Sequence, residues 1–523
     1  MKVTAGIMIH ADDLSLLPDE LPDAELVFAF VSPLGTPLDP IQDALIDALD
    51  DHDYEVDQLV RISANLDDMF PADDPEETAD ARQERLIDKG NWLRENLAHD
   101  YLALAAISAI YTSRQEADGE TTPKSRRAAI IRSLKHPDEV TRLRHVYGRG
   151  FFLIGVSAPR KLRVDTLVDR NFPKNRAHEL LDRDAAEEER SGQQTQKTFH
   201  LADAFLHLRE AEDPSITQKL KRIVDLLFSC PFLPPTREEH AMFMAYAAAM
   251  RSSDLSRQVG AVVANASDDI VASGANDVPA AGGGAHWGRP EPFDEAIENF
   301  GPDYAQGFDS NERERNKIVV ELLRAVVSEE EVAEAATPEQ RAAVVKRYED
   351  RLRKSGLLDL TEFGRAVHAE MAALMTCVRS GVSPRGGTLF CTTFPCHNCA
   401  KHIIAAGLEK VVYVEPYPKS KAKALHGEAI HLVDDDDAKP NGDKVVKFQA
   451  YEGVAARRFI DLFSLDLGGG RPFRRKSKHA DGARVEWKRG RGTSRPRLPL
   501  DPRSFLEREL AAARLFERED KTV

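Results

Sequence analysis

The sequence contains few cysteines and no long apolar segment. Five of the 523 residues are cysteine, and this odd, sparse count argues against a disulfide framework. No apolar run approaches the roughly 18 residues that a membrane-spanning helix requires. The opening residues, MKVTAGIMIHADD, turn acidic at once and lack the pattern of a secretory signal. These absences predict a cytoplasmic protein whose cysteines serve metal binding, catalysis or burial.

Aromatic residues are also scarce, and positive charge is concentrated in one segment. Aromatic side chains make up 7% of the chain, and the net charge is −16. Residues 471–497 carry eleven Lys and Arg against Asp481 and Glu486, a local charge of +9, so the remainder sums to −25. An acidic body with few aromatics disfavours a nucleic-acid channel. The basic segment could still bind nucleic acid, or it could dock onto the acidic body of this or another subunit.

Strand-like and helix-like patterns alternate over about residues 20–230. Short apolar runs rich in β-branched and aromatic residues predict strands, and amphipathic segments between them predict helices. This alternation is typical of an α/β domain with a doubly wound parallel sheet. The predicted strands are 25–32, 54–63, 127–134 and 151–158, and helices are predicted at 39–49 and 137–148.

A proline-rich stretch, CPFLPPT, separates this domain from a second one predicted over residues 236–465. A charged insertion at 278–365 interrupts the second domain, and residues 466–523 are predicted to form a basic, partly disordered tail. The second domain also combines strands and helices. Its predicted elements are a hairpin at 258–276, helices at 367–381 and 397–407, and strands at 388–394 and 410–416.

The segment TTFPCHNCAKH places Cys396 and Cys399 three residues apart at the start of a predicted helix. Such a pair suits a structural zinc site, a thioredoxin-like redox pair, or a catalytic zinc with three protein ligands and one open position. The remaining cysteines stand alone in the sequence, which argues against a site with four thiolates. The third interpretation needs one more ligand and a group that moves protons.

The segment VHAEM supplies both, as His368 and Glu370. The order H-x-E followed by P-C-x-x-C is the signature of zinc-dependent nucleobase deaminases. We therefore predict one zinc ion per chain, held by His368, Cys396 and Cys399. Glu370 is predicted to carry protons, first to the cytosine ring nitrogen and then to the departing ammonia. Residues two apart on a helix point in different directions, so His368 and Glu370 must lie in its first turn.

The second domain resembles the deoxycytidylate deaminases of the cytidine deaminase superfamily. The resemblance rests on these motifs and on RSSDLSRQVGAVV (251–263) and GANDVP (274–279). It implies a cytidine deaminase-like α/β/α fold, and Asn276 hydrogen-bonded to the sugar hydroxyl. The alternative is that Asn276 caps a turn.

Other residues of the second domain are candidates for substrate contact. Tyr413 and Tyr417, on and after the last strand, could line the pocket or only pack. A phosphorylated substrate requires a local basic pocket in an acidic protein. The candidates for that pocket are Arg251, Arg257, Lys419 and Lys421, and each could equally be a solvated surface charge.

The whole chain resembles the bacterial anti-phage dCTP deaminases, which join a P-loop kinase-like domain to a dCMP deaminase-like domain. This resemblance implies conversion of dCTP or dCMP to dUTP or dUMP, an antiviral role that deprives phage replication of nucleotides. It covers about residues 25–460. The segments that carry it are 132–159, 192–205, 280–287, 308–317 and 413–422.

The expected P-loop departs from its pattern. A working loop needs GxxxxGK[ST] with a lysine on the phosphates, whereas FVSPLGTPL keeps only Gly35 and Thr36. No lysine occurs between Lys2 and Lys89. Kinase activity is therefore not expected. A nucleotide effector could still bind backbone amides before helix 39–49, or the domain could be purely structural or join subunits.

Two other functions compete with nucleotide deamination. One is a polynucleotide deaminase that uses the basic tail as a guide, which deletion of residues 468–523 would test. The other is a catalytically silent nucleotide sensor, against which the complete set of His368, Glu370, Cys396 and Cys399 argues. Partners expected from the resemblance are a deoxycytidine nucleotide and other copies of the chain in a homo-oligomer. An RNA or protein inhibitor is conceivable.

Overall fold

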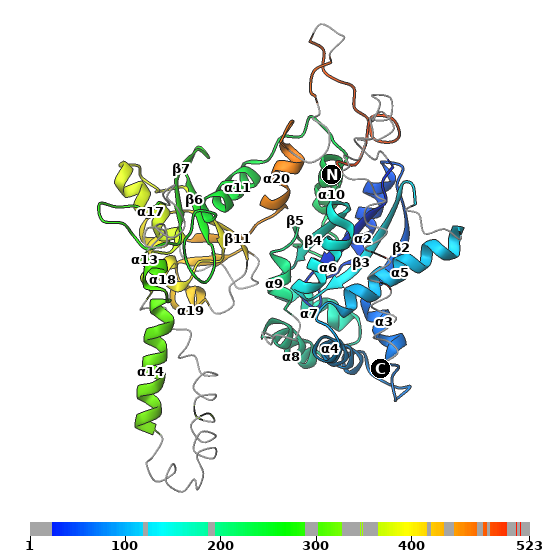
Figure 1. Ribbon diagram of the computed structural model, residues 1–523, viewed down its shortest axis with the longest axis horizontal. Helices are drawn as coiled ribbons and strands as arrows, with labels where there is room; N and C mark the ends of the chain where they lie inside the picture. The colour runs from blue at the N-terminus through cyan, green and yellow to red at the C-terminus, as the bar shows by residue number, and fades with distance from the viewer. Residues whose placement is uncertain are drawn as a thin grey trace, which may run out of the picture. The chain divides into compact units, whose positions relative to one another are not determined.

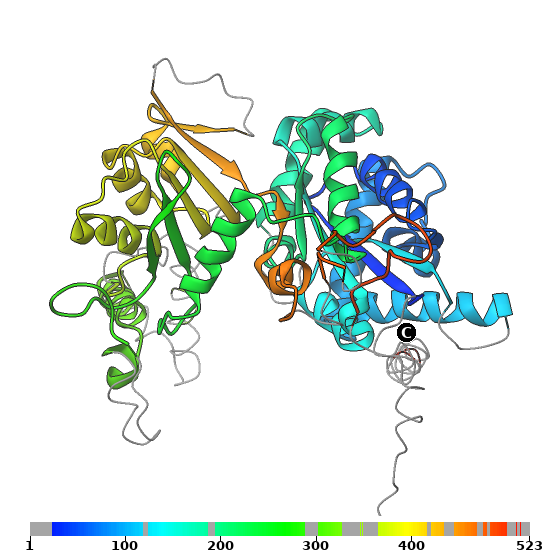
Figure 2. The same ribbon diagram turned by 90° about the horizontal axis from the view of Figure 1, so that it is seen from above.

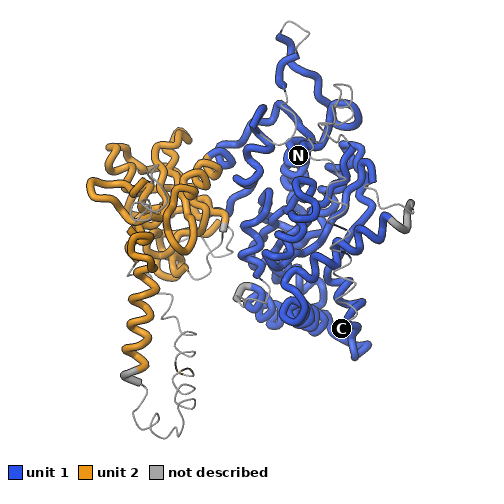
Figure 3. Tube along the Cα trace, in the orientation of Figure 1, with its two compact units in different colours: residues 1–240, 434–438, 450–523 blue, residues 241–433, 439–449 orange. Residues whose placement is uncertain are grey.

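A computed structural model shows that the chain forms two compact units (Figure 3). The first unit comprises residues 1–240, 434–438 and 450–523, and the second comprises residues 241–433 and 439–449. The prediction from sequence had assigned residues 450–465 to the second domain. The structure describes residues 23–118, 124–186, 194–287, 302–326, 346, 348, 364–415, 420–433, 444–467, 474–477, 482–498, 509 and 513.

The first unit is built on one six-stranded sheet (Figure 1). The strands follow the order β12-β5-β4-β1-β3-β2, and the short β12 alone runs antiparallel to its neighbour. The parallel α/β sheet predicted from sequence is therefore confirmed, while its kinase-like character stays a prediction. The strands are β1 (Leu26–Val31), β2 (Glu55–Arg61), β3 (Arg127–Leu134), β4 (Phe151–Ser157), β5 (Ala204–His207) and β12 (Gly453–Val454).

The central strand β1 is buried on both faces. Leu26, Phe28 and Phe30 share one core cluster with residues of α2 (Asp39–Asp50) and α10 (Pro214–Leu227). The intervening residues of the strand are also buried and point to the opposite face, because side chains alternate along a strand. This double burial explains why the strand is a continuous apolar run, LVFAFV, instead of an alternating one.

Further helices surround this sheet in the first unit. α5 and α6 contact each other, and α6 contacts β4. Besides α2 and α10, the described helices of this unit follow the strands and complete the layers visible in Figures 1 and 2. They are α3 (Ile62–Met69), α4 (Ala79–Asn96), α5 (Tyr101–Asp118), α6 (Pro137–Tyr147), the 3-10 turn Gly148–Gly150, α7 (Arg160–Asp169), α8 (Lys174–Ala186), α9 (Thr195–Phe199) and α20 (Ala456–Phe463).

The described part of the basic tail lies against this first unit. Arg489 forms two 2.8 Å contacts with the carboxylate of Asp225 on α10, and the Trp487 indole donates to the Phe228 carbonyl at 3.3 Å. Leu498 belongs to the same core cluster as α2 and α10. The buried Glu509 accepts hydrogen bonds from side chains of the first unit. Residues 482–498 and 509 therefore contribute to the packing of a unit that begins at the other end of the chain.

The second unit contains a mixed sheet of order β10-β11-β9-β8-β6-β7. Strand β6 runs antiparallel to β7 and β8, whereas β8 and β9 are parallel, as are β10 and β11. The strands are β6 (Gly260–Ala264), β7 (Ile270–Ala275), β8 (Thr388–Thr393), β9 (Lys410–Glu415), β10 (Ile430–Leu432) and β11 (Val446–Ala450). The helices are α11 (Arg237–Ala249), which spans the boundary between the units, α13 (Pro302–Gln306), α14 (Ser310–Val326), α17 (Ala369–Ser380), α18 (His397–Ala405) and α19 (Ala422–His426).

One glycine permits the close approach of α17 to this sheet. A Cβ atom at Gly274 on β7 would lie 2.3 Å from the Ala373 nitrogen and 2.4 Å from the Ala369 carbonyl oxygen. Any larger residue would push the helix away from the strand. The start of α17 is thus fixed by a strand that belongs to the hairpin predicted at 258–276, which the structure confirms.

Among the described residues, no helix combines the length and apolar character needed to cross a membrane.

Candidate active site and metal centre

Two helix starts bring the motif residues together. His368 is the N-cap of α17, and Cys396 is the N-cap of α18, each with extended backbone angles. Glu370 follows in the first turn of α17, as the sequence argument required. The first turn of a helix has free backbone amides and the positive end of the helix dipole. It therefore favours anionic groups such as a thiolate at this position.

Three ligand atoms converge between these helices. The His368 Nδ1 atom lies 3.3 Å from the Cys396 sulfur and 3.4 Å from the Cys399 sulfur. A tetrahedral zinc ion, with Zn–S of about 2.3 Å and Zn–N of about 2.0 Å, holds sulfur and nitrogen ligands about 3.5 Å apart. The separations in this structure match that value closely. His368, Cys396 and Cys399 thus fit zinc both in chemistry and in spacing.

The three ligands differ strongly in acidity. A hydrogen bond from Cys399, helped by His368, lowers the pKa of the Cys396 thiol to about 3. The same contact raises the pKa of Cys399, because its proton is held by the neighbouring sulfur. The hydrogen bond to Cys396 raises the pKa of His368 to about 9. Cys396 is therefore a thiolate at neutral pH, which is the form of cysteine that binds metal.

Glu370 is buried beside these ligands, with 3% of its surface exposed. Desolvation raises the pKa of its carboxyl group, and the charge of His368 opposes this only in part. A carboxyl group whose pKa is displaced toward neutrality can both accept and return a proton. This environment suits the role of proton carrier.

A cavity of about 220 Å³ opens onto this group. Arg365 contacts Asp303 at 3.2 Å across its wall. The charged residues of the wall are mostly acidic, so the arginines are the groups able to meet an anionic ligand. The lining residues include His368, Glu370, Cys396, Asp254, Arg257, Asn276, Asp303, Asp309, Arg365 and Phe394.

Asn276 lies in the cavity wall and supports the loop before β6. Its Oδ1 accepts from the Val259 amide at 2.7 Å, and its Nδ2 donates to the Arg257 carbonyl at 2.8 Å. Both atoms of the side-chain amide are therefore engaged with backbone, one on each side of residue 258. The structure brings Asn276 and Arg257 to the cavity, and the contact of Asn276 with a sugar hydroxyl stays a prediction.

The other predicted substrate residues are placed differently. Among the described residues, Phe394 rather than Tyr413 lines the cavity, and the Tyr413 ring packs edge-on against Phe394 at 4.8 Å. The Arg251 guanidinium lies 4.2 Å from the Trp287 ring centre. Lys421 is the N-cap of α19. Tyr417 and Lys419 fall outside the described residues.

Several cavity residues were not found from the sequence. Asp303, Asp309 and Arg365 come from the region that was treated as an insertion, and no motif spacing connects them to His368. The segment FDSNERERNK, which includes Asp309, contributed to the family resemblance, but its residues were assigned no role. Only the folded chain shows that this segment borders the cavity.

Gly35 and Thr36 follow β1 in a tight loop of the first unit. Gly35 has a positive φ of 79°, and a Cβ atom there would lie 2.6 Å from the Arg163 carbonyl oxygen. The Thr36 hydroxyl donates to the Pro33 carbonyl at 2.8 Å. The threonine hydroxyl thus makes a local turn contact.

A backbone amide of this loop is hydrogen-bonded to a carboxylate of the protein itself. The Leu34 amide donates to Asp184 at 2.8 Å, and Lys135 donates to Asp184 at 3.1 Å and to the Ser32 carbonyl at 2.8 Å. Lys135 follows β3, so folding brings a lysine to a loop that lacks one in sequence. The Asp184 carboxylate therefore already accepts the hydrogen bond of one backbone amide, that of Leu34, which a nucleotide phosphate would have to bind.

Comparison with known proteins matches the second unit to a family. Residues 235–415 match the model of the cytidine and deoxycytidylate deaminase zinc-binding region. The deoxycytidylate deaminase of Enterobacteria phage T2 is 44% identical over 55 residues, 10% of this chain and 29% of that protein. ComE operon protein 2 of Bacillus subtilis is 43% identical over 53 residues, 10% of this chain and 28% of that protein. The chain thus spans less than a third of the length of these curated relatives.

Among solved structures, a dCMP deaminase from the cyanophage S-TIM5 in complex with dCMP and dUMP is 22% identical, with a TM-score of 0.21. The match covers 37% of this chain and 91% of that one. The matched family region contains all three converging ligand atoms. Residues 235–415 are therefore similar to the zinc-binding region of cytidine and deoxycytidylate deaminases, with His368, Cys396 and Cys399 as candidate zinc ligands.

Proposed function

We propose that this protein is a hydrolase that deaminates free deoxycytidine nucleotides, converting dCTP or dCMP to dUTP or dUMP with a zinc cofactor. The observation that carries the proposal is that Glu370, His368 and Cys396 lie on the wall of one cavity, with Cys399 completing the group of ligand atoms. The match of residues 235–415 to the deaminase region supports the same chemistry. In a bacterial host, loss of dCTP would act as an antiviral, anti-phage defence.

The chain's own residues provide the proton transfers of this reaction. When bound, a zinc ion lowers the pKa of a coordinated water toward neutrality and so supplies the nucleophile for C4 of cytosine. Glu370 accepts a proton from the attacking water and delivers it to ring N3. It then takes the proton of the new C4 hydroxyl and passes it to the exocyclic amine; the C4–N bond breaks, a carbonyl forms at C4, and the amine leaves as ammonia. Burial of Glu370 keeps its carboxyl group able to hold the proton between these steps.

Free nucleotides suit the cavity better than a polynucleotide. Arg257 and Arg365 are the arginines among the described lining residues, and we propose that they bind the phosphates of one nucleotide. The neighbouring Asp254, Asp303 and Asp309 would repel the successive phosphates of a strand. A single-stranded substrate also needs stacking aromatics, and Phe394 is the aromatic residue among the described lining residues.

Further proposals concern nucleotide binding by the first unit and the assembly of the chain. We propose that the loop at Gly35 and Thr36 binds a nucleotide effector only when Asp184 leaves the Leu34 amide. A homo-oligomer and an RNA or protein inhibitor are further proposals from the family resemblance.

The proposed function is tested by incubating zinc-loaded protein with dCTP, dCMP, deoxycytidine and single-stranded DNA. Uracil nucleotides are expected from dCTP or dCMP and none from the Glu370→Ala variant. Products from single-stranded DNA alone would favour the polynucleotide deaminase. If no substrate gave a product while the protein held its full complement of zinc, the nucleotide sensor would be favoured.

A further inference from the structure

An ion pair lies in the wall of the proposed substrate cavity. The Arg365 guanidinium donates to the Asp303 carboxylate at 3.2 Å, and both residues line the cavity that His368 and Glu370 also line. The Arg365 side chain is 33% exposed and that of Asp303 is 14% exposed. An arginine in such a place is a natural partner for a phosphate group. In this structure, however, Arg365 is engaged with a carboxylate of the chain itself.

Arg365 lies on a segment that is fastened to the sheet close to the metal centre. It precedes His368 by three residues, on the connection that leads into α17. The backbone of Val367, between them, exchanges two hydrogen bonds with Asp277, at 2.8 and 3.2 Å. Asp303 comes from α13, 62 positions earlier in the chain. Because the two charges lie on separate segments, a rotamer change of the Arg365 side chain can separate them without a change in the backbone.

The negative charge of Asp303 is poorly compensated. Among the described residues, Arg365 is the group that donates to its carboxylate. Burial raises the pKa of the Asp303 carboxyl, and the charge of Arg365 opposes this only in part. The nearby carboxylates of Asp254, Asp309 and Asp277 raise the pKa further. Asp303 therefore keeps its negative charge chiefly because Arg365 lies beside it.

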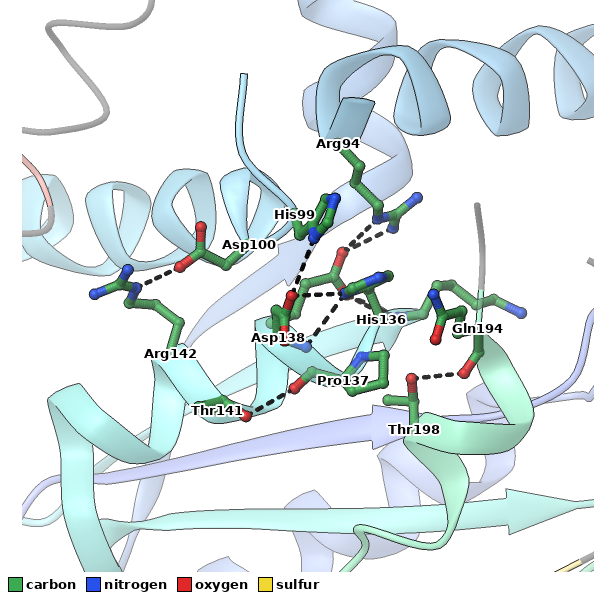
Figure 4. A network of polar contacts seen from close by, with 12 residues as sticks. Arg94, His99, Asp100, His136, Pro137, Asp138, Thr141, Arg142, Gln194 and Thr198 are labelled. Atoms are coloured by element: carbon green, nitrogen blue, oxygen red, sulfur yellow. Dashed lines mark hydrogen bonds and ion pairs between the residues drawn. The ribbon is translucent and has the colours of Figure 1, made fainter. Parts of the chain in front are cut away.

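A buried ion pair of the first unit provides a contrast, since its carboxylate is fully compensated (Figure 4). Two N–H groups of Arg94 donate to Glu139 at 2.7 and 3.0 Å. The backbone amides of Lys135 and His136 donate to the other Glu139 oxygen at 2.8 and 3.1 Å. That carboxylate completes the cap of α6. The Asp303 carboxylate has no such backbone donors among the described residues, so exchange of its partner costs less.

A nucleotide phosphate is a stronger partner for Arg365 than this carboxylate. A phosphate monoester carries nearly two negative charges at neutral pH, and arginine can bind it through two parallel N–H···O bonds. In this structure a single guanidinium nitrogen contacts Asp303. If the phosphate takes Arg365, Asp303 is left beside three carboxylates without its counter-charge. A buried carboxylate in such surroundings becomes protonated.

We propose that Asp303 competes with the substrate phosphate for Arg365 and takes up a proton from solvent when the phosphate binds. The inference rests on the proposed function, because it assigns Arg365 to the phosphate of a deoxycytidine nucleotide. Asp303 thereby lowers the affinity of the cavity for nucleotides at neutral pH. Deoxycytidine has no phosphate to displace Asp303, so its binding is independent of the exchange.

The direction of the pH effect follows from the proton that is taken up. Binding that consumes a proton becomes tighter as the pH falls through the range in which Asp303 of the complex is protonated. The phosphate itself titrates, with a second pKa of about 6, and its monoanion binds arginine less strongly. Replacement of Asp303 by asparagine keeps this contribution, so the difference between the two proteins isolates Asp303. The other charged or titratable groups of the described surroundings are also common to both proteins: Asp254, Arg257, Asp277, Asp309, Arg365, His368 and Glu370.

The test measures binding of dCMP, dCTP and deoxycytidine to zinc-loaded full chain by calorimetry. Glu370→Gln is the background, so that the ligands are not consumed. Addition of Asp303→Asn should raise the affinity for the nucleotide about two- to fivefold at pH 7 and leave that for deoxycytidine unchanged. Repetition in buffers of different ionisation enthalpy should show proton uptake with Asp303 and its loss in Asp303→Asn. Asp269→Asn, at an exposed turn of the same unit, is the matched control and should change neither quantity.

Each other result overturns the exchange. Unchanged nucleotide affinity in Asp303→Asn would exclude competition, and reduced affinity would mean that Asp303 orients Arg365 for the phosphate. Equal proton uptake with and without Asp303 would exclude the protonation step. Zinc content confirms that the metal centre of each variant is intact. Deamination by wild type is scored separately, so failure of the exchange leaves the proposed function standing, whereas nucleotide binding without turnover in wild type would contradict the proposed function alone.

Discussion

The imidazole Nδ1 of His368 lies 3.3 Å from the sulfur of Cys396, although the two residues are 28 positions apart in the chain. Each is the N-cap of a different helix, so the contact depends on how α17 and α18 begin against the sheet. The geometry of the metal centre is consequently sensitive to backbone packing as well as to the identity of its ligands.

Replacement of Glu370 by glutamine should abolish turnover without loss of zinc. The amide keeps the shape of the side chain but cannot accept and return a proton, so the rate of deamination should fall by at least about 100-fold. Chromatography of the products and metal analysis of the same sample would check both statements. Glu409→Gln, at an exposed position in the same unit, should keep full activity. Wild-type rates in Glu370→Gln would remove the residue from the mechanism.

Replacement of Cys399 by serine should release zinc from the His368 site. A neutral hydroxyl is a far poorer ligand than a thiolate, so we expect zinc affinity to fall by more than about 100-fold. Metal content after dialysis against a chelator provides the measurement. Cys377→Ala is the matched control, because Cys377 is a buried core residue of α17 and should not affect zinc retention. Zinc that persists in Cys399→Ser would point to a different ligand.

Substitution of Gly274 by alanine should lower both stability and activity, although Gly274 is not among the described residues that line the cavity. The added methyl group would collide with the backbone of α17. Such overpacking costs about 1–3 kcal/mol and would displace the helix that carries Glu370. Chemical denaturation and the deamination rate should change together. Gly150→Ala, where the nearest atom to a new Cβ is 3.7 Å away, should change neither.

The pH dependence of unfolding should report the contact between Arg489 and Asp225. Burial acts to raise the pKa of Asp225, but hydrogen bonds from Arg489 and His52 outweigh it and hold the pKa below the usual value. A folded-state pKa below the unfolded one stabilises the fold above the unfolded pKa of about 4. This stabilisation is lost as the pH falls through the folded pKa.

Replacement of Arg489 by alanine should therefore cost about 1–3 kcal/mol at neutral pH. The difference from wild type should shrink under acid conditions, when Asp225 becomes protonated in both proteins. Urea unfolding at several pH values would measure the difference. Arg491→Ala, which leaves the contact of the Arg491 amide with Asp53 in place, is the control. A pH-independent difference would mean that Arg489 acts through packing.

Removal of residues 468–523 should destabilise the first unit instead of merely removing a basic tail. Deletion would take Leu498 out of the core and leave Asp225 without Arg489. Loss of a cooperative unfolding transition, read by calorimetry, is the expected result. Charge reversal at the exposed Arg484 and Arg491 is therefore a cleaner test of polynucleotide binding than truncation. A truncated protein of unchanged stability would contradict the packing described for the tail.

The parts predicted well from sequence are those with a local signal. The apolar run of β1 and the close spacing of Cys396 and Cys399 each reflect a few neighbouring residues, so periodicity and motif chemistry were sufficient. Asp303 could not be assigned, because it lies far from His368 in the sequence and no motif links the two residues. Lys135 likewise reaches the loop after β1 only through pairing of β1 with β3. Contacts between segments that are far apart in the sequence produce no periodic pattern of residues from which they could be predicted.

The return of the chain to the first unit after residue 450 has a consequence for synthesis on the ribosome. Strand β12, Leu498 and Glu509 complete that unit but are translated after the whole second unit. At about 5–20 residues per second, they emerge roughly 10–55 s after residue 240. The second unit can fold in this interval, whereas the first must wait with part of its core uncovered. We therefore expect the nascent first unit to depend on chaperones more than its length suggests.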